Sequence, residues 1–272
     1  MRDLYAVMGN PIAHSKSPFI HTQFAVQTKQ SLDYKAILVD KNAFPQAVSA
    51  FQAKSGRGLN ITVPFKEEAW QLVDEKSVMA EKAGAVNTII VKEDGALLGD
   101  NTDGVGIVRD IKLNHGVSLA GKRILILGAG GAVRGVLGPI LNEEPDSITI
   151  ANRTVSRAQA LLEIFNVASN IQAKGFDEIT GKFDVVINGT AASLSGEMPP
   201  IPSNCVVDSI CYDMMYAKED TVFMQWAKQH GASKTLDGLG MLVEQAAESF
   251  YLWRDVRPDT QSVIESVRKS FS

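Results

Sequence analysis

The sequence predicts an α/β protein with two domains, and three observations support this. Short apolar segments alternate with helix-length amphipathic segments along almost the whole chain. One apolar segment, at residues 124–127, runs directly into a glycine cluster and then into a helical pattern. The chain has 272 residues and 45% apolar content, which is enough for two modest domains with separate cores.

The first domain begins with a predicted strand at residues 4–8, which ends in a Gly-Asn-Pro turn. Pro18 suits the first turn of a helix predicted over residues 19–29. Ser15 and Ser17 come just before this helix, so their hydroxyls gather near its first backbone amides. The two serines therefore form either a binding site for a carboxylate or phosphate group, or only the N-cap of the helix.

A functional lysine is predicted after the third strand. Apolar periodicity indicates a strand at 31–39, a helix at 42–53 and a strand at 58–63. Lys66 follows at the start of an amphipathic helix, where the helix dipole disfavours a cation. Ligands bind at the carboxyl ends of strands in open α/β sheets, so Asn60, Thr62 and Lys66 are candidates for a site. A solvated lysine is the alternative.

The first domain is predicted to end where a helix begins near Asp103. A short helix at 78–82 and a hairpin of strands at 89–91 and 96–98 precede it. Asp103 opens a helix over 105–113, and an aspartate in that position is either an N-cap or a functional carboxylate.

The glycine cluster at 128–132 predicts a phosphate-binding turn. Gly128 can adopt the backbone angles of the turn, and Gly130 and Gly131 let a pyrophosphate approach backbone N–H groups. With a second strand at 147–151, the segment completes a βαβ unit of the Rossmann type. Val133 occupies the third position of the G-x-G-x-x-G/A fingerprint, where it adds bulk between helix and strand.

The tip of the second strand predicts the cofactor. A carboxylate there would bind the ribose hydroxyls of NAD, whereas Arg153 would attract the 2′-phosphate of NADP(H). Arg157 lies one helical turn further on, and Thr154 is the expected N-cap of that helix. The alternative is a pair of solvated arginines at a helix start.

The rest of the pattern continues a doubly wound domain. Strands are predicted at 171–173, 185–188, 206–208 and 234–236, with helices at 221–230, 238–254 and 260–271. The loops at 188–190 and 209–212 are expected at the same sheet edge as Gly128. Residues 198–202 are proline-rich and predict a surface loop.

Composition excludes several classes of function. The net charge of −4 and a pI near 5.6 give no electrostatic case for nucleic acid or an anionic membrane. Cys205 and Cys211 lack the spacing of a zinc site, so no metal is expected, and low cysteine use fits a reducing compartment. No long apolar run is present, and we therefore expect a cytoplasmic protein that acts on a small molecule.

Several stretches together carry a resemblance to a known family: SKSP at 15–18, NITVPFK at 60–66, GAVNT at 84–88, NTDG at 101–104, GAGGA at 128–132, NRT at 152–154 and DGLGMLVEQAA at 237–247. In this order they resemble shikimate dehydrogenase. The resemblance implies reversible NADPH-dependent reduction of 3-dehydroshikimate to shikimate, a step of chorismate and aromatic amino acid biosynthesis.

The resemblance also implies a domain organisation and a set of site residues. Residues 1–103 would form an N-terminal α/β substrate domain, completed by helices at 238–272, and residues 104–237 a Rossmann-type, doubly wound dinucleotide-binding domain. Substrate binding would fall to Ser15, Ser17, Asn60, Thr62, Asn87, Asp103, Tyr216 and Gln245. Cofactor binding would fall to Gly128, Ala129, Gly130, Gly131, Ala132, Asn152, Arg153, Thr154, Arg157, Thr190, Met214, Gly238 and Met241. The protein would be a monomer or a homodimer.

Carbonyl reduction independently requires a hydride donor and a proton donor beside the developing alkoxide. We therefore expect Lys66 to be the general acid/base, and Asp103 to orient it as one coupled pair. Two departures from the family pattern, Val133 and the apolar Val78, bear on cofactor affinity. Two other functions remain open: oxidation of quinate or another ring acid, with NAD as an alternative cofactor, and a non-catalytic NADP-binding sensor.

Overall fold

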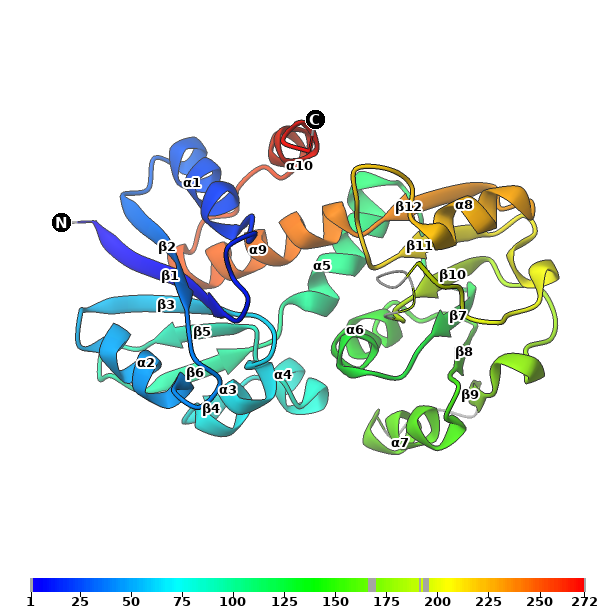
Figure 1. The fold of residues 1–272 in the computed structure, drawn as a ribbon, viewed down its shortest axis with the longest axis horizontal. Helices are drawn as coiled ribbons and strands as arrows, with labels where there is room; N and C mark the ends of the chain where they lie inside the picture. Colours follow the sequence, from blue (N-terminus) through cyan, green and yellow to red (C-terminus); the bar gives the residue numbers. More distant parts are fainter. Residues whose placement is uncertain (1, 166–169, 191, 193–195, 272) are drawn as a thin grey trace. The chain divides into compact units, whose positions relative to one another are not determined.

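The computed structural model describes residues 2–165, 170–190, 192 and 196–271 of the chain (Figure 1). The chain divides into two compact units. Unit 1 comprises Met1–Gly106 and Leu242–Phe271, and unit 2 comprises Ile107–Met241. The divisions at 106/107 and 241/242 lie near the boundaries that the sequence predicts at 103/104 and 237/238. Within the described ranges, no helix is both long enough and apolar enough to span a membrane.

Unit 1 is built on a mixed sheet with the strand order β2-β1-β3-β5-β6-β4. The strands are β1 (Asp3–Gly9), β2 (Leu32–Leu38), β3 (Gly56–Ile61), β4 (Glu75–Lys76), β5 (Thr88–Val91) and β6 (Leu97–Asp100). The β1 strand is parallel to β2 and β3, whereas β5 is antiparallel to both β3 and β6. The two-residue strand β4 is not predicted, because it is too short to show any period.

Helices cover both faces of this sheet (Figure 1). The helices that lie wholly or partly in unit 1 are α1 (Ser17–Thr28), α2 (Phe44–Gln52), α3 (Lys66–Leu72), α4 (Val78–Ala83), α5 (Asp103–Arg109), α9 (Leu239–Arg254) and α10 (Gln261–Lys269). Ala6 and Met8 of β1 join a core with Phe44 and Phe51 of α2. Tyr5, on the opposite face, stacks on Trp253 of α9 with ring centroids 4.8 Å apart. Since alternate residues of a strand face opposite sides, both sides of β1 are buried.

Unit 2 has a parallel sheet with the strand order β12-β11-β10-β7-β8-β9. Its strands are β7 (Arg123–Leu127), β8 (Ser147–Ala151), β9 (Ile171–Lys174), β10 (Val185–Asn188), β11 (Ile210–Asp213) and β12 (Lys234–Asp237). The order runs outward in both directions from β7, which is the doubly wound arrangement of a Rossmann fold. The α/β fold class predicted from the sequence is therefore confirmed. The strand order reverses between β7 and β10, which are parallel neighbours, and ligands bind at such a switch point in these sheets.

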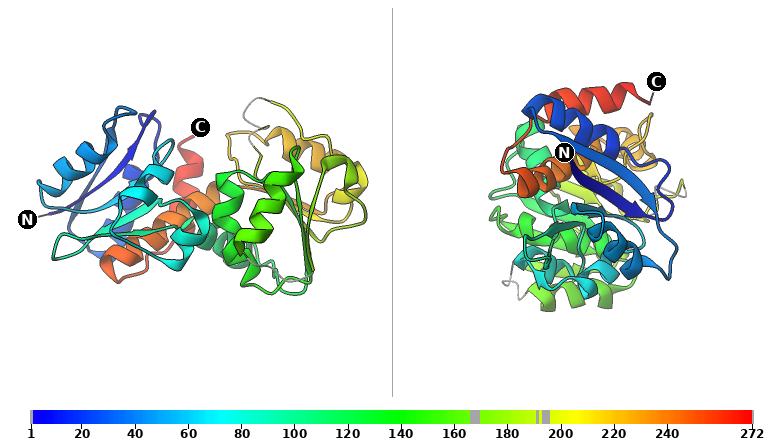
Figure 2. Two further views of the ribbon diagram at one scale, coloured as in Figure 1. Left: turned by 90° about the horizontal axis from the view of Figure 1, so that it is seen from below. Right: turned by 90° about the vertical axis from the view of Figure 1, so that its left-hand side faces the viewer.

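The helices of unit 2 lie on both faces of its sheet (Figure 2). They are α6 (Gly131–Leu141), α7 (Val155–Phe165) and α8 (Val222–Gln229). Ile124 and Ile126 of β7 pack with residues of α6 and α7, whereas Leu125 and Leu127 pack with residues of α8. This alternation explains why β7 is apolar at four successive positions, since a strand covered on both faces has no polar side.

One predicted strand is wrong. Residues 206–208 do not form a strand: Ser203–Val206 forms a turn of 3₁₀ helix, and Asp208 has a positive φ of 63°. The strand is β11, which begins at Ile210. Val206 is fully buried in the 3₁₀ turn, so its apolar character indicates burial and not an extended conformation. The loop at the sheet edge is therefore the one that follows Asp213, and residues 209–212 largely belong to the strand.

Candidate active site

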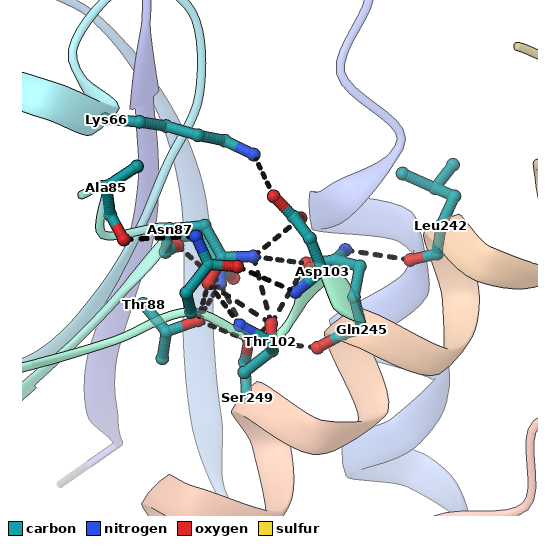
Figure 3. Close-up of polar contacts among 11 residues, drawn as sticks. Lys66, Ala85, Asn87, Thr88, Thr102, Asp103, Leu242, Gln245 and Ser249 are labelled. Carbon is teal, nitrogen blue, oxygen red and sulfur yellow. Dashed lines mark hydrogen bonds and ion pairs between the residues drawn. The ribbon is translucent and has the colours of Figure 1, made fainter. Parts of the chain in front are cut away.

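A close ion pair in unit 1 joins the two residues with predicted catalytic roles. Lys66 Nζ lies 2.5 Å from Asp103 Oδ2, and the side chains are 31% and 15% exposed (Figure 3). Lys66 is the first residue of α3, and Asp103 is the first residue of α5. The Lys66 backbone is fixed because its carbonyl accepts from Val86 N, and Asp103 N donates to Asn101 Oδ1. The partial exposure leaves the ammonium group able to meet a ligand.

Asn87 holds the other oxygen of this carboxylate. Its Nδ2 donates to Asp103 Oδ1 over 2.8 Å, while its Oδ1 accepts from the backbone N–H of Thr102 over 3.0 Å. A backbone N–H can only donate, so this contact identifies which end of the amide carries oxygen. Asn87 is 2% exposed, and its orientation is fixed from both ends. Asp103 is thereby held between a lysine and an amide donor.

Gln245 reaches the same cluster from α9. Its Oε1 lies 3.4 Å from Asn87 Nδ2, and its Nε2 donates to the carbonyl of Leu242 (Figure 3). The hydroxyls of Thr88, Thr102 and Ser249 complete the cluster, and no local sequence pattern predicts a role for them. Ser249 lies four residues after Gln245, so helical spacing places both side chains on one face of α9.

Asn60 lies deeper in unit 1, beside this cluster. Its Oδ1 accepts from the Tyr34 hydroxyl over 2.7 Å, and its Nδ2 donates to Ser249 Oγ over 3.0 Å. Burial raises the pKa of Tyr34 well above its ordinary value, although a hydrogen bond with Ser17 opposes the shift. The phenol is therefore neutral and able to donate. Ser17, Tyr34 and Asn60 form one connected set.

The serine loop and Thr62 are placed by backbone contacts. Ser15 Oγ accepts from Ser17 N at the start of α1, and both serines are partly buried. Lys16 lies between them in sequence, and its ammonium group donates to Ser270 Oγ. Thr62 N donates to the carbonyl of Met8. The methyl group of Thr62 packs against Gly9, the residue that follows Met8. No side chain could be added at Gly9 without displacing Thr62.

The glycine turn of unit 2 leaves its backbone accessible. Gly128 has a φ of 104°, which favours glycine, and a Cβ there would lie 3.1 Å from the Gly189 carbonyl oxygen. A Cβ added at Gly130 or Gly131 would meet nothing within 4 Å. The helix α6 begins at Gly131, after which Ala132 follows. Unpaired N–H groups at the start of a helix of this length can bind a phosphate.

Two loops beside this turn are tied together by buried polar groups. Thr190 Oγ1 donates to Asn188 Oδ1 over 2.7 Å, and Asn188 Nδ2 donates to Asp213 Oδ1 over 3.2 Å. The same Asp213 oxygen accepts from Met215 N. This places the loop after β10, with Thr190, next to the loop after β11, with Met214.

The remaining candidates of unit 2 lie around the same sheet edge. Asn152 follows β8, and its Nδ2 donates to the carbonyl of Thr154. Arg153 and Arg157 are exposed at the start of α7. Gly238 follows β12 and packs so closely on the Met214 carbonyl that a side chain would collide with it. Met241 is partly buried and packs against the core of unit 2. Burial raises the pKa of the Tyr216 hydroxyl, and the nearby Asp237 carboxylate raises it further.

Unit 1 thus contains a lysine–aspartate ion pair held by a fixed amide, and unit 2 contains an accessible glycine turn and two exposed arginines. Comparisons with known proteins identify the family. Three family models match the chain: Shikimate dehydrogenase substrate binding domain over residues 7–89, Shikimate / quinate 5-dehydrogenase over 111–195, and Shikimate 5′-dehydrogenase C-terminal domain over 238–268.

The similarity to individual proteins extends over nearly the whole chain. The shikimate dehydrogenase (NADP(+)) of Alkalilimnicola ehrlichii is 57% identical over 98% of this chain and 99% of its own. The crystal structure of an Ael1 enzyme from Pseudomonas putida has a TM-score of 0.94 at 42% identity and covers 97% of both chains. The Thermus thermophilus shikimate 5-dehydrogenase, solved with NADP(H) and shikimate, has a TM-score of 0.86 at 30% identity, over 98% of this chain and 99% of that one. The chain belongs to the NADP(+)-dependent shikimate dehydrogenase family of oxidoreductases.

Proposed function

We propose that this chain catalyses the reversible reduction of 3-dehydroshikimate to shikimate, with Lys66 as general acid/base and Asp103 as its partner. The contact of 2.5 Å between Lys66 Nζ and Asp103 Oδ2 carries the proposal. An ammonium group donates its proton to the alkoxide that forms on reduction, and the amine takes it back on oxidation. Asp103 keeps the flexible lysine side chain in one place.

The other candidate residues of unit 1 would bind the hydroxylated ring of the substrate. Asn60, Thr62, Asn87 and Gln245 present amides and a hydroxyl, which suit the hydroxyl groups of a polyol. Ser15 and Ser17, at the start of α1, would hold the carboxylate of the substrate. The shared position of these groups within unit 1 supports this assignment.

The residues of unit 2 fit NADP(H), the cofactor of this family. Gly128, Gly130 and Gly131 leave space at the start of α6 for a pyrophosphate, and Arg153 and Arg157 would bind the 2′-phosphate. Thr190, Met214, Gly238 and Met241 would flank the nicotinamide. NADPH, when bound, supplies the hydride.

The name of the relatives supports a place for the reaction in aromatic amino acid biosynthesis. Cys205 and Cys211 are buried free thiols, and burial raises their pKa to about 12 and about 11. Unpaired thiols suit a reducing compartment, so we place the enzyme in the cytoplasm.

Oxidation of quinate is a second candidate activity, since the family model that matches residues 111–195 covers both shikimate and quinate 5-dehydrogenases. Initial rates with shikimate and with quinate, each with NADP⁺ and with NAD⁺, distinguish the candidates at the nicotinamide absorbance. We expect a strong preference for shikimate with NADP⁺. A higher rate with quinate would assign the second activity, and no rate with any pair would favour a non-catalytic sensor.

The role of Lys66 is tested with Lys66→Ala. We expect kcat to fall by ~10² or more while the affinity for NADPH stays nearly unchanged, because a general acid contributes about this much. Lys54→Ala, at an exposed position after α2, is the matched control and should retain full activity. An unchanged kcat in Lys66→Ala would remove this lysine from the chemistry.

A further inference from the structure

A continuous chain of buried hydrogen bonds leads from Tyr34 to Asp103. Asn60, Ser249, Thr88 and Asn87 connect them, and these four side chains are between 0% and 6% exposed. Three segments far apart in the sequence supply them: β3, residues 87–88 at the start of β5, and α9. Because the bonds are shielded from water, each one is electrostatically stronger than at the surface.

Backbone groups fix both amides of this chain. Asn60 Nδ2 lies 3.3 Å from the carbonyl oxygen of Asn87, which can only accept, so this end of the Asn60 amide donates. Asn60 Oδ1 is therefore the acceptor of the Tyr34 hydroxyl. The N–H of Thr102 fixes the Asn87 amide in the same way, with Oδ1 as the acceptor and Nδ2 on Asp103.

These two fixed amides determine the direction of the hydroxyls between them. Thr88 Oγ1 donates to Asn87 Oδ1 over 2.9 Å, which uses the single proton of that hydroxyl. Thr88 Oγ1 also lies 2.7 Å from Ser249 Oγ, and two oxygens at this distance need a proton between them. With the Thr88 proton on Asn87, Ser249 supplies the proton of this second bond. Its oxygen in turn accepts from Asn60 Nδ2 over 3.0 Å.

We propose that Ser249 is a positioning residue of the active site, which acts on Asp103 through Thr88 and Asn87. Its proton holds the Thr88 hydroxyl directed at Asn87, and the bond from Thr88 holds the Asn87 amide on the Asp103 carboxylate. Every bond in the chain points toward Asp103, so each one polarises the next in the same sense. The inference rests on the proposed role of Asp103 as the partner of Lys66.

An alternative acceptor for the Ser249 proton would reverse the hydrogen bond between Ser249 and Thr88. The carbonyl of Gln245 lies 3.1 Å from Ser249 Oγ, as is usual for a serine inside a helix. If this carbonyl took the proton, Thr88 would have to turn its own proton to Ser249, and Asn87 Oδ1 would keep only its contacts with Thr102. The positioning role and a purely helical role of Ser249 therefore predict different effects on catalysis.

The first test compares Ser249→Ala with Ser249→Thr. Ser249→Ala removes only the hydroxyl, and we expect kcat/KM for shikimate to fall about tenfold, with KM for NADP⁺ unchanged. Ser249→Thr keeps the hydroxyl but adds a methyl group at a fully buried position, so it should lower the melting temperature more and activity less. Equal losses of activity in the two variants, in step with their melting temperatures, would overturn the proposal.

A matched control and a double mutant complete the test. Ser209→Ala removes another fully buried serine hydroxyl, in unit 2, and should lower stability without changing kcat/KM. Thr88→Val keeps the shape of Thr88 and removes its hydroxyl. We expect Ser249→Ala/Thr88→Val to be no slower than Thr88→Val alone, because both changes break the same chain. Additive losses would contradict the inference.

The outcome for Lys66→Ala separates this inference from the proposed function. If Lys66→Ala is inactive and Ser249→Ala behaves as wild type, only the positioning role fails. If Lys66→Ala retains full activity, the proposed function of the ion pair fails first.

Discussion

His21 is a titratable ring enclosed among aromatic side chains. It is fully buried and stacks on Tyr34, with ring centroids 4.2 Å apart and planes at 7°. Phe24, Phe250 and Trp253 surround it. Burial lowers the pKa of His21 to about 3, and the neighbouring Asn60 side chain opposes this shift to a smaller extent. The ring is therefore neutral in the folded protein at any pH near neutrality.

This residue makes stability depend on pH. Between pH 6.5 and about 3 the unfolded chain protonates His21 and the folded chain does not, so the unfolded state binds more protons and stability falls as pH falls. Between pH 7.5 and 5 the loss is about 2 kcal/mol. Urea unfolding at the two pH values should show that His21→Phe lacks this part of the loss, whereas His14→Gln, at an exposed position, retains it. The same pH dependence in His21→Phe and wild type would refute the assignment.

Arg153 is predicted to select the cofactor. Arg153→Asp places a carboxylate where the 2′-phosphate would bind, so KM for NADP⁺ should rise by about 10², far more than KM for NAD⁺. Initial rates with both cofactors measure the two constants. Lys182→Asp, which reverses an exposed charge elsewhere in unit 2, controls for the change in net charge. Equal losses with the two cofactors would mean that Arg153 does not contact the 2′-phosphate.

At the scale of elements, Val133 shows how a departure from a sequence fingerprint is accommodated. Val133 is fully buried in α6, and a Cβ added at Gly189 would lie 2.5 Å from Val133 Cγ2. A small residue at the third fingerprint position would leave space between α6 and its surroundings. In this chain the position holds valine, and Gly189, after β10, leaves room for the valine side chain. The bulk of Val133 therefore packs the start of α6 against this loop.

The pairing of Val133 with Gly189 predicts a compensating double mutant. Gly189→Ala should destabilise the protein by about 1–3 kcal/mol, because the branched Val133 side chain cannot turn away. Val133→Ala should also destabilise it, by loss of buried methyl groups. The double variant should lose less than the sum of the two, as measured by urea unfolding. Additive losses would show that the two positions do not compete for the same space.

Local patterns predict most elements, and they fail for identifiable reasons. The predicted strands at 147–151 and 185–188 coincide with β8 and β10, since a run of apolar residues between turn signals is a strong local pattern. At 206–208 the pattern fails because a 3₁₀ turn can be as buried as a strand. Ser249 escapes prediction because its partners Asn60 and Thr88 lie more than 150 residues away in sequence. Motifs locate Lys66 and Asp103, whereas the buried hydroxyls behind them follow only from the tertiary structure.

At the scale of the whole molecule, unit 1 is discontinuous in sequence. Its first segment ends at Gly106, and its second begins at Leu242, inside α9. Phe250 contacts Phe24, and Trp253 donates through Nε1 to the carbonyl of Ile89. The helix α9 therefore completes the core of the unit whose sheet is formed by the first hundred residues.

A truncated chain that ends at Met241 tests this dependence. Without α9, one face of the unit 1 sheet is uncovered, so limited proteolysis should degrade residues 1–106 and spare residues 107–241. A chain that ends at Pro258 retains α9 and loses α10, and should resist proteolysis better. If the shorter chain resists over residues 1–106 as the full chain does, unit 1 does not need α9.

The position of α9 also sets an order of events on the ribosome. The strands of unit 1 are synthesised first, yet the residues that cover them emerge last. All of unit 2 is translated in between, so the unit that starts second can be completed first. For most of translation the nascent N-terminal segment lacks the helix that covers one face of its sheet, so we expect that apolar face to stay exposed until α9 is synthesised.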